Sequence, residues 1–228
     1  MELIKKQTEL NGNTFNYLEG GDPSALPIVA LHSLGNSATS WVHVAAGLEG
    51  DYRFIALDQR GHGESVRTDT YSFEEMREDL LLFVDALNLE RFILLGHSMG
   101  GTVSYLFSQQ YPARLEKLIV VDTPPPFPDE PIEIPPEPVE PLPFDWKALQ
   151  SIMGQLNSPN PTWWEKLSAI ITPTLIIGGS SSNIPQDKLR EVSELIPDCK
   201  MVTVDGAGHH VHHDKLPEFL TILNNYLD

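Results

Sequence analysis

The sequence has 228 residues, 41% of them hydrophobic, which suits one α/β domain with a full core, and we expect a single domain over residues 1–228. A formal charge of −17, from 15 basic and 32 acidic residues, argues against nucleic acid and anionic membranes as partners. No apolar run reaches the roughly 20 residues of a membrane span, residues 1–6 lack the apolar core of a signal peptide, and the only cysteine, Cys199, excludes an internal disulfide, so we expect a cytoplasmic location.

Along the chain, short apolar strand candidates alternate with amphipathic helix candidates. Residues 3–7 and 14–19 flank the turn Asn11-Gly12-Asn13 and predict an N-terminal hairpin. Ser72 is the expected N-cap of a helix over 73–87. The further strands are expected at 27–32, 53–58, 92–95, 118–121, 173–177 and 200–204, and the further helices at 102–110, 186–196 and 216–227. This alternation is typical of an α/β fold with a parallel sheet.

The segment Gly96-His97-Ser98-Met99-Gly100, called the elbow below, matches the G-x-S-x-G pattern and lies between a predicted strand and a predicted helix. Five residues can match by chance, so the strand–turn–helix context carries the prediction. A serine hydroxyl is a poor nucleophile unless the fold presents it to a base, and the following helix directs its positive end toward developing negative charge. Gly96 and Gly100 lack a Cβ atom, which lets a strained turn pack closely. We therefore expect Ser98 to be a nucleophile.

An oxyanion formed at Ser98 needs two N–H donors. Met99, the residue after the nucleophile, is expected to supply one. The loop 32–37 follows a predicted strand, and we choose the backbone N–H of Leu34 as the second donor. His32 at the start of this loop is expected to brace it by hydrogen bonds and not to act as a base.

The base is expected to be His209, which follows the strand 200–204 after a glycine-rich loop. His210, His212 and His213 come later and are expected to enter the closing helix. The alternative for this group of histidines is metal binding, which we disfavour because no cysteine or acid of suitable spacing accompanies it. We therefore expect no metal and no cofactor.

The acid that orients the base is harder to find. The loop after the strand 173–177 is the first place to look, but residues 178–185 contain no carboxylate, and Asp187 begins a helix. Asp122 instead stands at the carboxyl end of the strand 118–121, where sites of α/β proteins form. We assign Asp122 as the acid that holds the base in the right tautomer, with Asp187 as the alternative.

Residues 58–65 form a glycine-punctuated loop at another strand end. A phosphate-binding role would need a spacing that fits neither G-x-G-x-x-G nor the P-loop. We favour structural bracing for this loop.

Residues 124–143 hold ten of the 19 prolines and five acidic residues, so they cannot form an ordinary helix or a central strand. We expect an extended, polyproline-like surface segment, followed by helical stretches at 146–156 and 163–170. A linker between two domains is disfavoured, because residues 175–204 still have to complete the same sheet. We interpret residues 124–170 as an insertion over the sheet edge, a reduced lid. Trp163 and Trp164 could line its entrance or pack in its core.

The motifs at 31–37, 58–65, 96–101, 173–179 and 206–212 together make the chain resemble the α/β-hydrolase superfamily over nearly its whole length. The resemblance implies an eight-stranded, mostly parallel sheet with helices on both faces and a triad of Ser98, His209 and an acid. The chain looks most similar to small bacterial esterases in which the acid follows the strand after the elbow helix, which supports Asp122. Ser33 departs from the family pattern, which usually has glycine there, and the lid is shorter and richer in proline.

The resemblance implies hydrolysis of carboxylic esters, with small, short-acyl esters favoured by a reduced lid. A serine nucleophile argues against haloalkane dehalogenase and epoxide hydrolase chemistry, which use aspartate at the elbow. Two alternatives stay open. The same triad could serve a lyase, a perhydrolase or a C–C bond hydrolase, or the scaffold could be a weakly catalytic small-ligand receptor or signalling partner, with the acidic proline segment as a docking strip.

Overall fold

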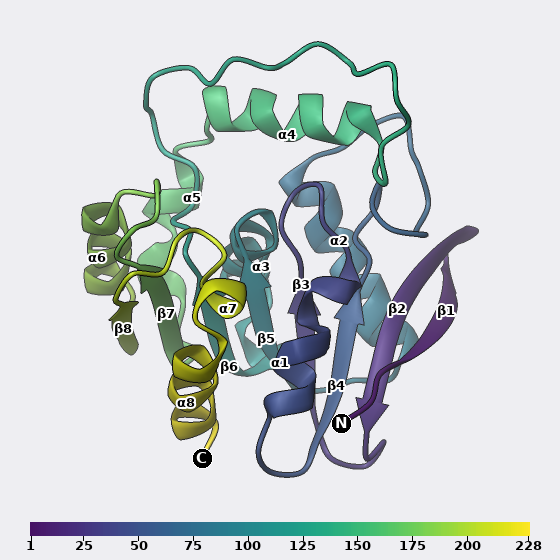
Figure 1. Cartoon of the computed structure of the whole chain (residues 1–228), viewed down its shortest axis with the longest axis vertical. Coiled ribbons are helices and arrows are strands. Elements are labelled where there is room, and N and C mark those ends of the chain that lie inside the picture. Colours follow the sequence, from purple (N-terminus) through teal and green to yellow (C-terminus); the bar gives the residue numbers. More distant parts are fainter.

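The computed structural model describes all 228 residues and is organised around one sheet (Figure 1). The eight strands are β1 (Ile4–Leu10), β2 (Asn13–Gly21), β3 (Leu26–Leu31), β4 (Tyr52–Leu57), β5 (Phe92–His97), β6 (Leu115–Val121), β7 (Thr174–Gly179) and β8 (Cys199–Val204). They lie in the order β1-β2-β4-β3-β5-β6-β7-β8; β1 and β2 run antiparallel to their neighbours and the others are parallel. The predicted eight-stranded, mostly parallel sheet is confirmed.

Both faces of the sheet are covered, which explains why its central strands are apolar at every position. In β5, Phe92 and Leu94 belong to a core shared with α2 (Phe73–Ala86), α3 (Met99–Gln110) and α6 (Gln186–Leu195). Ile93 and Leu95 point the other way, into a core shared with α1 (Val42–Gly47), α7 (Val211–Asp214) and α8 (Leu216–Leu227). Successive side chains of a strand face opposite sides, so a strand buried on both faces reads as a continuous apolar run.

Local signals fix several boundaries. Asn11 and Gly12 both have positive φ, 50° and 81°, as a tight hairpin turn between β1 and β2 requires. The Ser72 side chain accepts the Glu75 N–H at 3.1 Å and donates to the Glu75 carboxylate at the same distance, so α2 starts at the predicted cap. The short helices η1 (Ala38–Trp41) and α1 were not expected from the sequence.

The prediction that His210, His212 and His213 enter the closing helix is wrong. His210 precedes α7, His212 and His213 lie in α7, which ends at Asp214, and α8 begins separately at Leu216. The break lies at Lys215, whose φ of −138° and ψ of 52° lie outside the helical region, and Pro217 in the first turn of α8 has no N–H to donate to a carbonyl of α7.

Residues 124–170 connect β6 to β7, and β7 and β8 then complete the same sheet. The first part has no helix or strand, apart from a single bridge between Phe144 and His62, and residues 128–141 are exposed. It is followed by α4 (Trp146–Asn157), α5 (Thr162–Glu165) and η3 (Leu167–Ala169), so the helix expected over 163–170 is two short pieces. In Figure 1, α4 lies across the top of the molecule, beyond the carboxyl ends of the parallel strands, and the proline-rich chain passes over it. No helix of the protein has the length and apolar character that crossing a membrane requires.

Candidate active site

Ser98 occupies the sharp turn between β5 and α3. Its backbone has φ 53° and ψ −118°, a conformation that a residue with a side chain adopts only at a cost. Its N–H donates to the carbonyl of Val121 at 3.3 Å, which fixes the turn against the end of β6. The serine is half-buried at the N-terminus of α3, as the elbow pattern predicts.

Two glycines make the turn possible by close packing. A Cβ atom on Gly96 would lie 2.3 Å from the hydroxyl oxygen of Ser104 and 2.4 Å from the carbonyl oxygen of Gly100. A Cβ atom on Gly100 would lie 2.4 Å from the carbonyl oxygen of Leu31 in β3. Any side chain at either position would collide with backbone, which confirms the predicted steric role of both glycines.

Asp122 directly follows β6 and is completely buried, with a positive φ of 49°. Its Oδ2 lies 2.8 Å from Nδ1 of His209, a residue 87 positions later on the loop after β8. An ionised carboxylate only accepts hydrogen bonds, so Nδ1 carries the proton and Nε2 is left as the basic nitrogen. The His209 side chain is 23% exposed. The structure thus brings together the predicted acid and the predicted base, and Asp187 makes no such contact.

The end of β7, the loop after it and the start of α6 supply donors to Asp122 in place of a carboxylate. Gly179 N–H donates to Oδ1 at 2.9 Å, the Gln186 amide donates to the same oxygen at 3.2 Å, and the Ser182 hydroxyl donates to Oδ2. The Gln186 amide also donates to the Ile184 carbonyl at 3.1 Å, which fixes its orientation. Sequence reasoning missed Ser182 and Gln186; the only signal was the unoccupied acid position between residues 178 and 185.

His97 is a further residue that the sequence did not single out. It is buried beside the base, and its Nε2 donates to the carbonyl of His209 at 2.9 Å. Burial holds the pKa of His97 well below its usual value, so the ring stays neutral and braces the loop that carries His209. His212 stacks on Trp41 with ring centroids 4.5 Å apart. No group of three or more histidine, cysteine or acidic side chains is arranged to hold a metal ion.

Ser98 and His209 are not joined by a hydrogen bond in the structure. Both residues are nevertheless held at the carboxyl end of β6. The Ser98 N–H bonds to the carbonyl of Val121, and the His209 ring bonds to the carboxylate of the next residue, Asp122. Catalytic hydrogen bonds are often long before a substrate is engaged.

The two predicted oxyanion donors also lie next to the elbow. The N–H groups of Met99 and Leu34 donate to no protein acceptor, and Gly100 N–H bonds to the His32 carbonyl at 3.2 Å, tying the loop of Leu34 to α3. Unpaired N–H groups at a helix N-terminus and on a facing loop are the donors that an oxyanion requires.

His32 and Asp58 hold the surrounding loops. Nδ1 of His32 donates to the Ser33 carbonyl at 2.8 Å, and its Nε2 accepts the Gln59 N–H at 3.0 Å. Burial lowers the pKa of His32 to about 4, so the ring is neutral, as a brace must be. Asp58 accepts the Ala38 N–H at 2.7 Å through one carboxylate oxygen and a second backbone N–H through the other. These bonds confirm the bracing roles that the sequence suggested for both loops.

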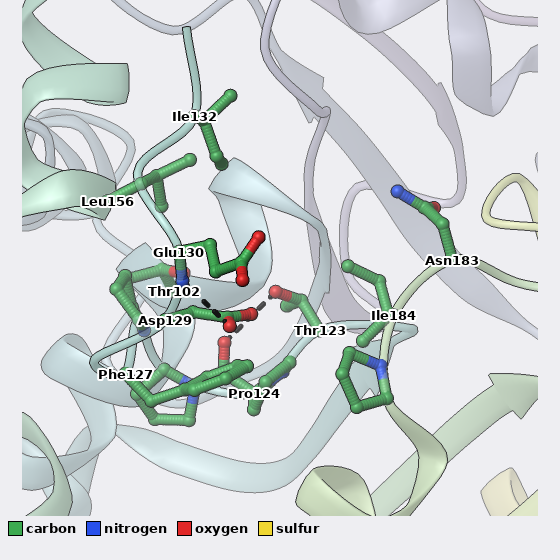
Figure 2. A pocket seen from close by; sticks show the side chains of 13 residues that line it. Thr102, Thr123, Pro124, Phe127, Asp129, Glu130, Ile132, Leu156, Asn183 and Ile184 are labelled. Atoms are coloured by element: carbon green, nitrogen blue, oxygen red, sulfur yellow. Dashed lines mark hydrogen bonds between the residues drawn. The ribbon is translucent and has the colours of Figure 1, made fainter.

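A cavity of about 300 Å³ lies beside the elbow, between α3, the end of β6 and the proline-rich segment (Figure 2). Its walls include Thr102, Thr123, Phe127 and Ile184. Trp163 and Trp164 are not among its lining residues. Trp163 packs in the main core, and the Trp164 ring N–H donates to the carbonyls of residues 125 and 126, so both stabilise the insertion and do not form this cavity's entrance.

Comparison with known proteins agrees with the fold. A sequence profile described as the alpha/beta hydrolase fold matches residues 27–146. A Haemophilus influenzae protein named as an esterase/lipase is 30% identical, over 85% of this chain and 79% of the relative. Esterase YbfF of Escherichia coli is 26% identical, over 89% of this chain and 93% of the relative. The crystal structure of E-2-(acetamidomethylene)succinate hydrolase superposes with a TM-score of 0.86 at 22% identity, covering 100% of both chains, and shares the fold.

Proposed function

The chain belongs to the α/β hydrolase fold family, and from that membership we propose that it is a serine esterase that hydrolyses small carboxylic esters with short acyl chains. The relatives named as esterases support an ester substrate. The observation that carries the proposal is the hydrogen bond between Asp122 and His209, formed where the strained turn at Ser98 ends β5.

In the proposed reaction, Nε2 of His209 takes the Ser98 proton while the serine oxygen attacks the ester carbonyl. The N–H groups of Leu34 and Met99 hold the oxyanion of the tetrahedral intermediate. His209 then gives its proton to the leaving alcohol, and an acyl group remains on Ser98. A water molecule, activated by His209, releases the carboxylic acid and restores the serine. Asp122 stabilises the imidazolium formed in both steps.

Short acyl chains are favoured for a structural reason. The cavity beside the elbow measures about 300 Å³, at the lower end of the range for small-molecule pockets. We interpret residues 124–170 as a reduced lid within one domain, because most of the proline-rich part is exposed and α4 alone extends across the strand ends. We expect such a lid to leave the site open and to favour small, soluble esters over long lipids.

The test is turnover of p-nitrophenyl acetate together with labelling by a fluorophosphonate probe. We expect the wild-type protein to hydrolyse the ester and to be labelled, and Ser98→Ala to lose both. As a matched control, Ser104→Ala removes another buried hydroxyl from the same helix and should keep both, since Ser104 bonds only to the Gly100 carbonyl. Retained turnover in Ser98→Ala would reject the nucleophile, and a wild-type protein without turnover or labelling would reject the esterase.

A further inference from the structure

Two residues in the wall of the cavity beside the elbow are neighbours of proposed triad residues (Figure 2). Thr102 lies one helical turn after the nucleophile, and its N–H donates to the Ser98 carbonyl at 3.0 Å. Thr123 directly follows Asp122 in the chain. The cavity therefore adjoins the start of α3 and the end of β6, the two elements that carry the proposed nucleophile and acid, although Ser98 itself does not line it.

Thr102 contributes to the cavity wall a hydroxyl that has no hydrogen-bond partner in the protein. The residue is only 2% exposed, and its hydroxyl makes no hydrogen bond with any protein group. The other wall threonine differs, because the Thr123 hydroxyl donates to the Pro124 carbonyl at 3.0 Å. The hydroxyl is not among the fully buried polar atoms that lack a partner, so it reaches the cavity, where a ligand group can bond to it.

The rim of the cavity is acidic. Asp129 and Glu130 line it, no lysine or arginine does, and neither carboxylate forms an ion pair. One cation lies on the other side of the wall: Lys188 packs over the Phe127 ring at 5.5 Å, but it is paired with Glu191 at 2.7 Å. A cleft lined by one sign of charge attracts the opposite charge and repels its own.

The rim is also held in place. Ile132 N–H donates to the Asn157 side-chain oxygen at 2.7 Å, and the Asn157 amide donates back to the Ile132 carbonyl at 2.9 Å. This reciprocal pair ties the proline-rich segment to the end of α4, so the two carboxylates stay above the cavity.

We propose that this cavity binds the acyl chain of the ester and selects short chains that end in an ammonium group, while it rejects chains that end in a carboxylate. The inference rests on the proposed esterase function. The acyl chain is assigned to this cavity because the alcohol must leave past His209, whose side chain is partly exposed. The ammonium would donate to the Thr102 hydroxyl and to the rim carboxylates.

Three ethyl esters of similar shape test this selection. Ethyl pentanoate, ethyl 4-aminobutyrate and monoethyl succinate end in a neutral, a positive and a negative group at pH 7, and acid release in a pH-stat gives kcat/KM for each. We expect the ammonium ester to exceed the succinate half-ester by about tenfold or more at low ionic strength, with the ratio falling as salt is added. Equal kcat/KM values for the ammonium ester and the succinate half-ester would overturn the proposed selection. A preference for the succinate half-ester would do the same. Hydrolysis of ethyl pentanoate in either case would still support the proposed esterase function.

Two double variants distinguish the effect of the rim carboxylates from the effect of the protein's overall negative charge. Asp129→Asn with Glu130→Gln should lower the ammonium-to-carboxylate ratio by roughly 3- to 10-fold. Glu137→Gln with Glu140→Gln removes the same charge from a different surface hollow and should leave the ratio unchanged. Thr102→Val, which keeps the shape, should lower turnover of the ammonium ester relative to pentanoate. Equal effects of the two double variants would overturn the inference, and no hydrolysis of any of the three esters would overturn both the inference and the proposed function.

Discussion

Ser182 donates its hydroxyl proton to the carboxylate of Asp122. The direction is fixed because the same hydroxyl oxygen accepts the Ile184 N–H at 3.0 Å, and an ionised carboxylate can only accept. With His209 as the second donor to Oδ2, and with Gly179 and Gln186 bonded to Oδ1, both oxygens are satisfied. Since Asp122 is fully buried, these donors take the place of water around the charge.

Ser182→Ala should therefore lower kcat without a comparable change in KM. The variant removes one of the bonds that orient the carboxylate toward His209, and a hydrogen bond to a charged group contributes about 1.5–3 kcal/mol, which corresponds to a loss of roughly 10- to 100-fold. The measurement is steady-state hydrolysis of p-nitrophenyl acetate. Ser181→Ala, an exposed neighbour without a side-chain hydrogen bond, is the control and should stay near wild type. Indistinguishable rates for the two variants would remove Ser182 from the positioning of the acid.

Asp122→Asn should cost about 10³- to 10⁴-fold in kcat, because an amide next to Nδ1 no longer stabilises the imidazolium and can favour the wrong tautomer. Asp187→Asn should change kcat less than about twofold. Asp187 is exposed in the first turn of α6, where its carboxylate only stabilises the helix through the helix dipole and does not contact His209. Parallel kcat measurements on the two variants decide between the acids, and the opposite ranking would transfer the role to Asp187.

The parts of this site that follow from the sequence are those set by strand ends. Ser98, Asp122 and His209 each come directly after a strand or its short loop, and the carboxyl ends of parallel strands meet at one edge. Ser182 and Gln186 could not be predicted in this way, since a serine in a loop and a glutamine at the start of a helix carry no pattern until the geometry shows what they face. The cavity was also beyond prediction, because its outer wall is an irregular proline-rich segment with no periodicity to place it.

Substituting one glycine in the elbow and one in α4 by alanine tests how closely the elbow is packed. Gly100→Ala should lower the free energy of unfolding by about 2 kcal/mol or more, because the new Cβ atom would meet the Leu31 backbone at 2.4 Å and the two elements would have to separate. Gly154→Ala should raise it by roughly 0.5–1 kcal/mol, because Gly154 lies inside α4 with nothing within 4 Å of the added Cβ atom. Urea unfolding of both variants measures the difference. A destabilised Gly154→Ala would contradict the helix assigned to α4.

The buried histidines make folding stability depend on pH. Burial lowers the pKa of His32 to about 4, although the bond to the Ser33 carbonyl acts in the opposite direction, whereas the unfolded chain has the ordinary value near 6.5. Between these values the unfolded state binds a proton that the folded state does not, so stability is complete above about pH 6.5 and is lost as the pH falls toward 4. For His32 the loss is about 3 kcal/mol, and His62, with its pKa lowered to about 3, acts in the same direction.

His32→Asn isolates this contribution. The variant should be less stable than wild type at pH 7, because the Gln59 N–H loses its acceptor, but the gap should narrow at pH 4.5, because the variant no longer has a histidine there to protonate on unfolding. Urea unfolding at several pH values gives the slope of stability against pH, which should fall by about one proton per molecule between pH 6 and 4.5. The exposed His43→Asn serves as the control and should run parallel to wild type. If the His32→Asn and wild-type curves are also parallel, His32 is not the neutral brace that its two hydrogen bonds describe, and the loop that carries Leu34 is held in another way.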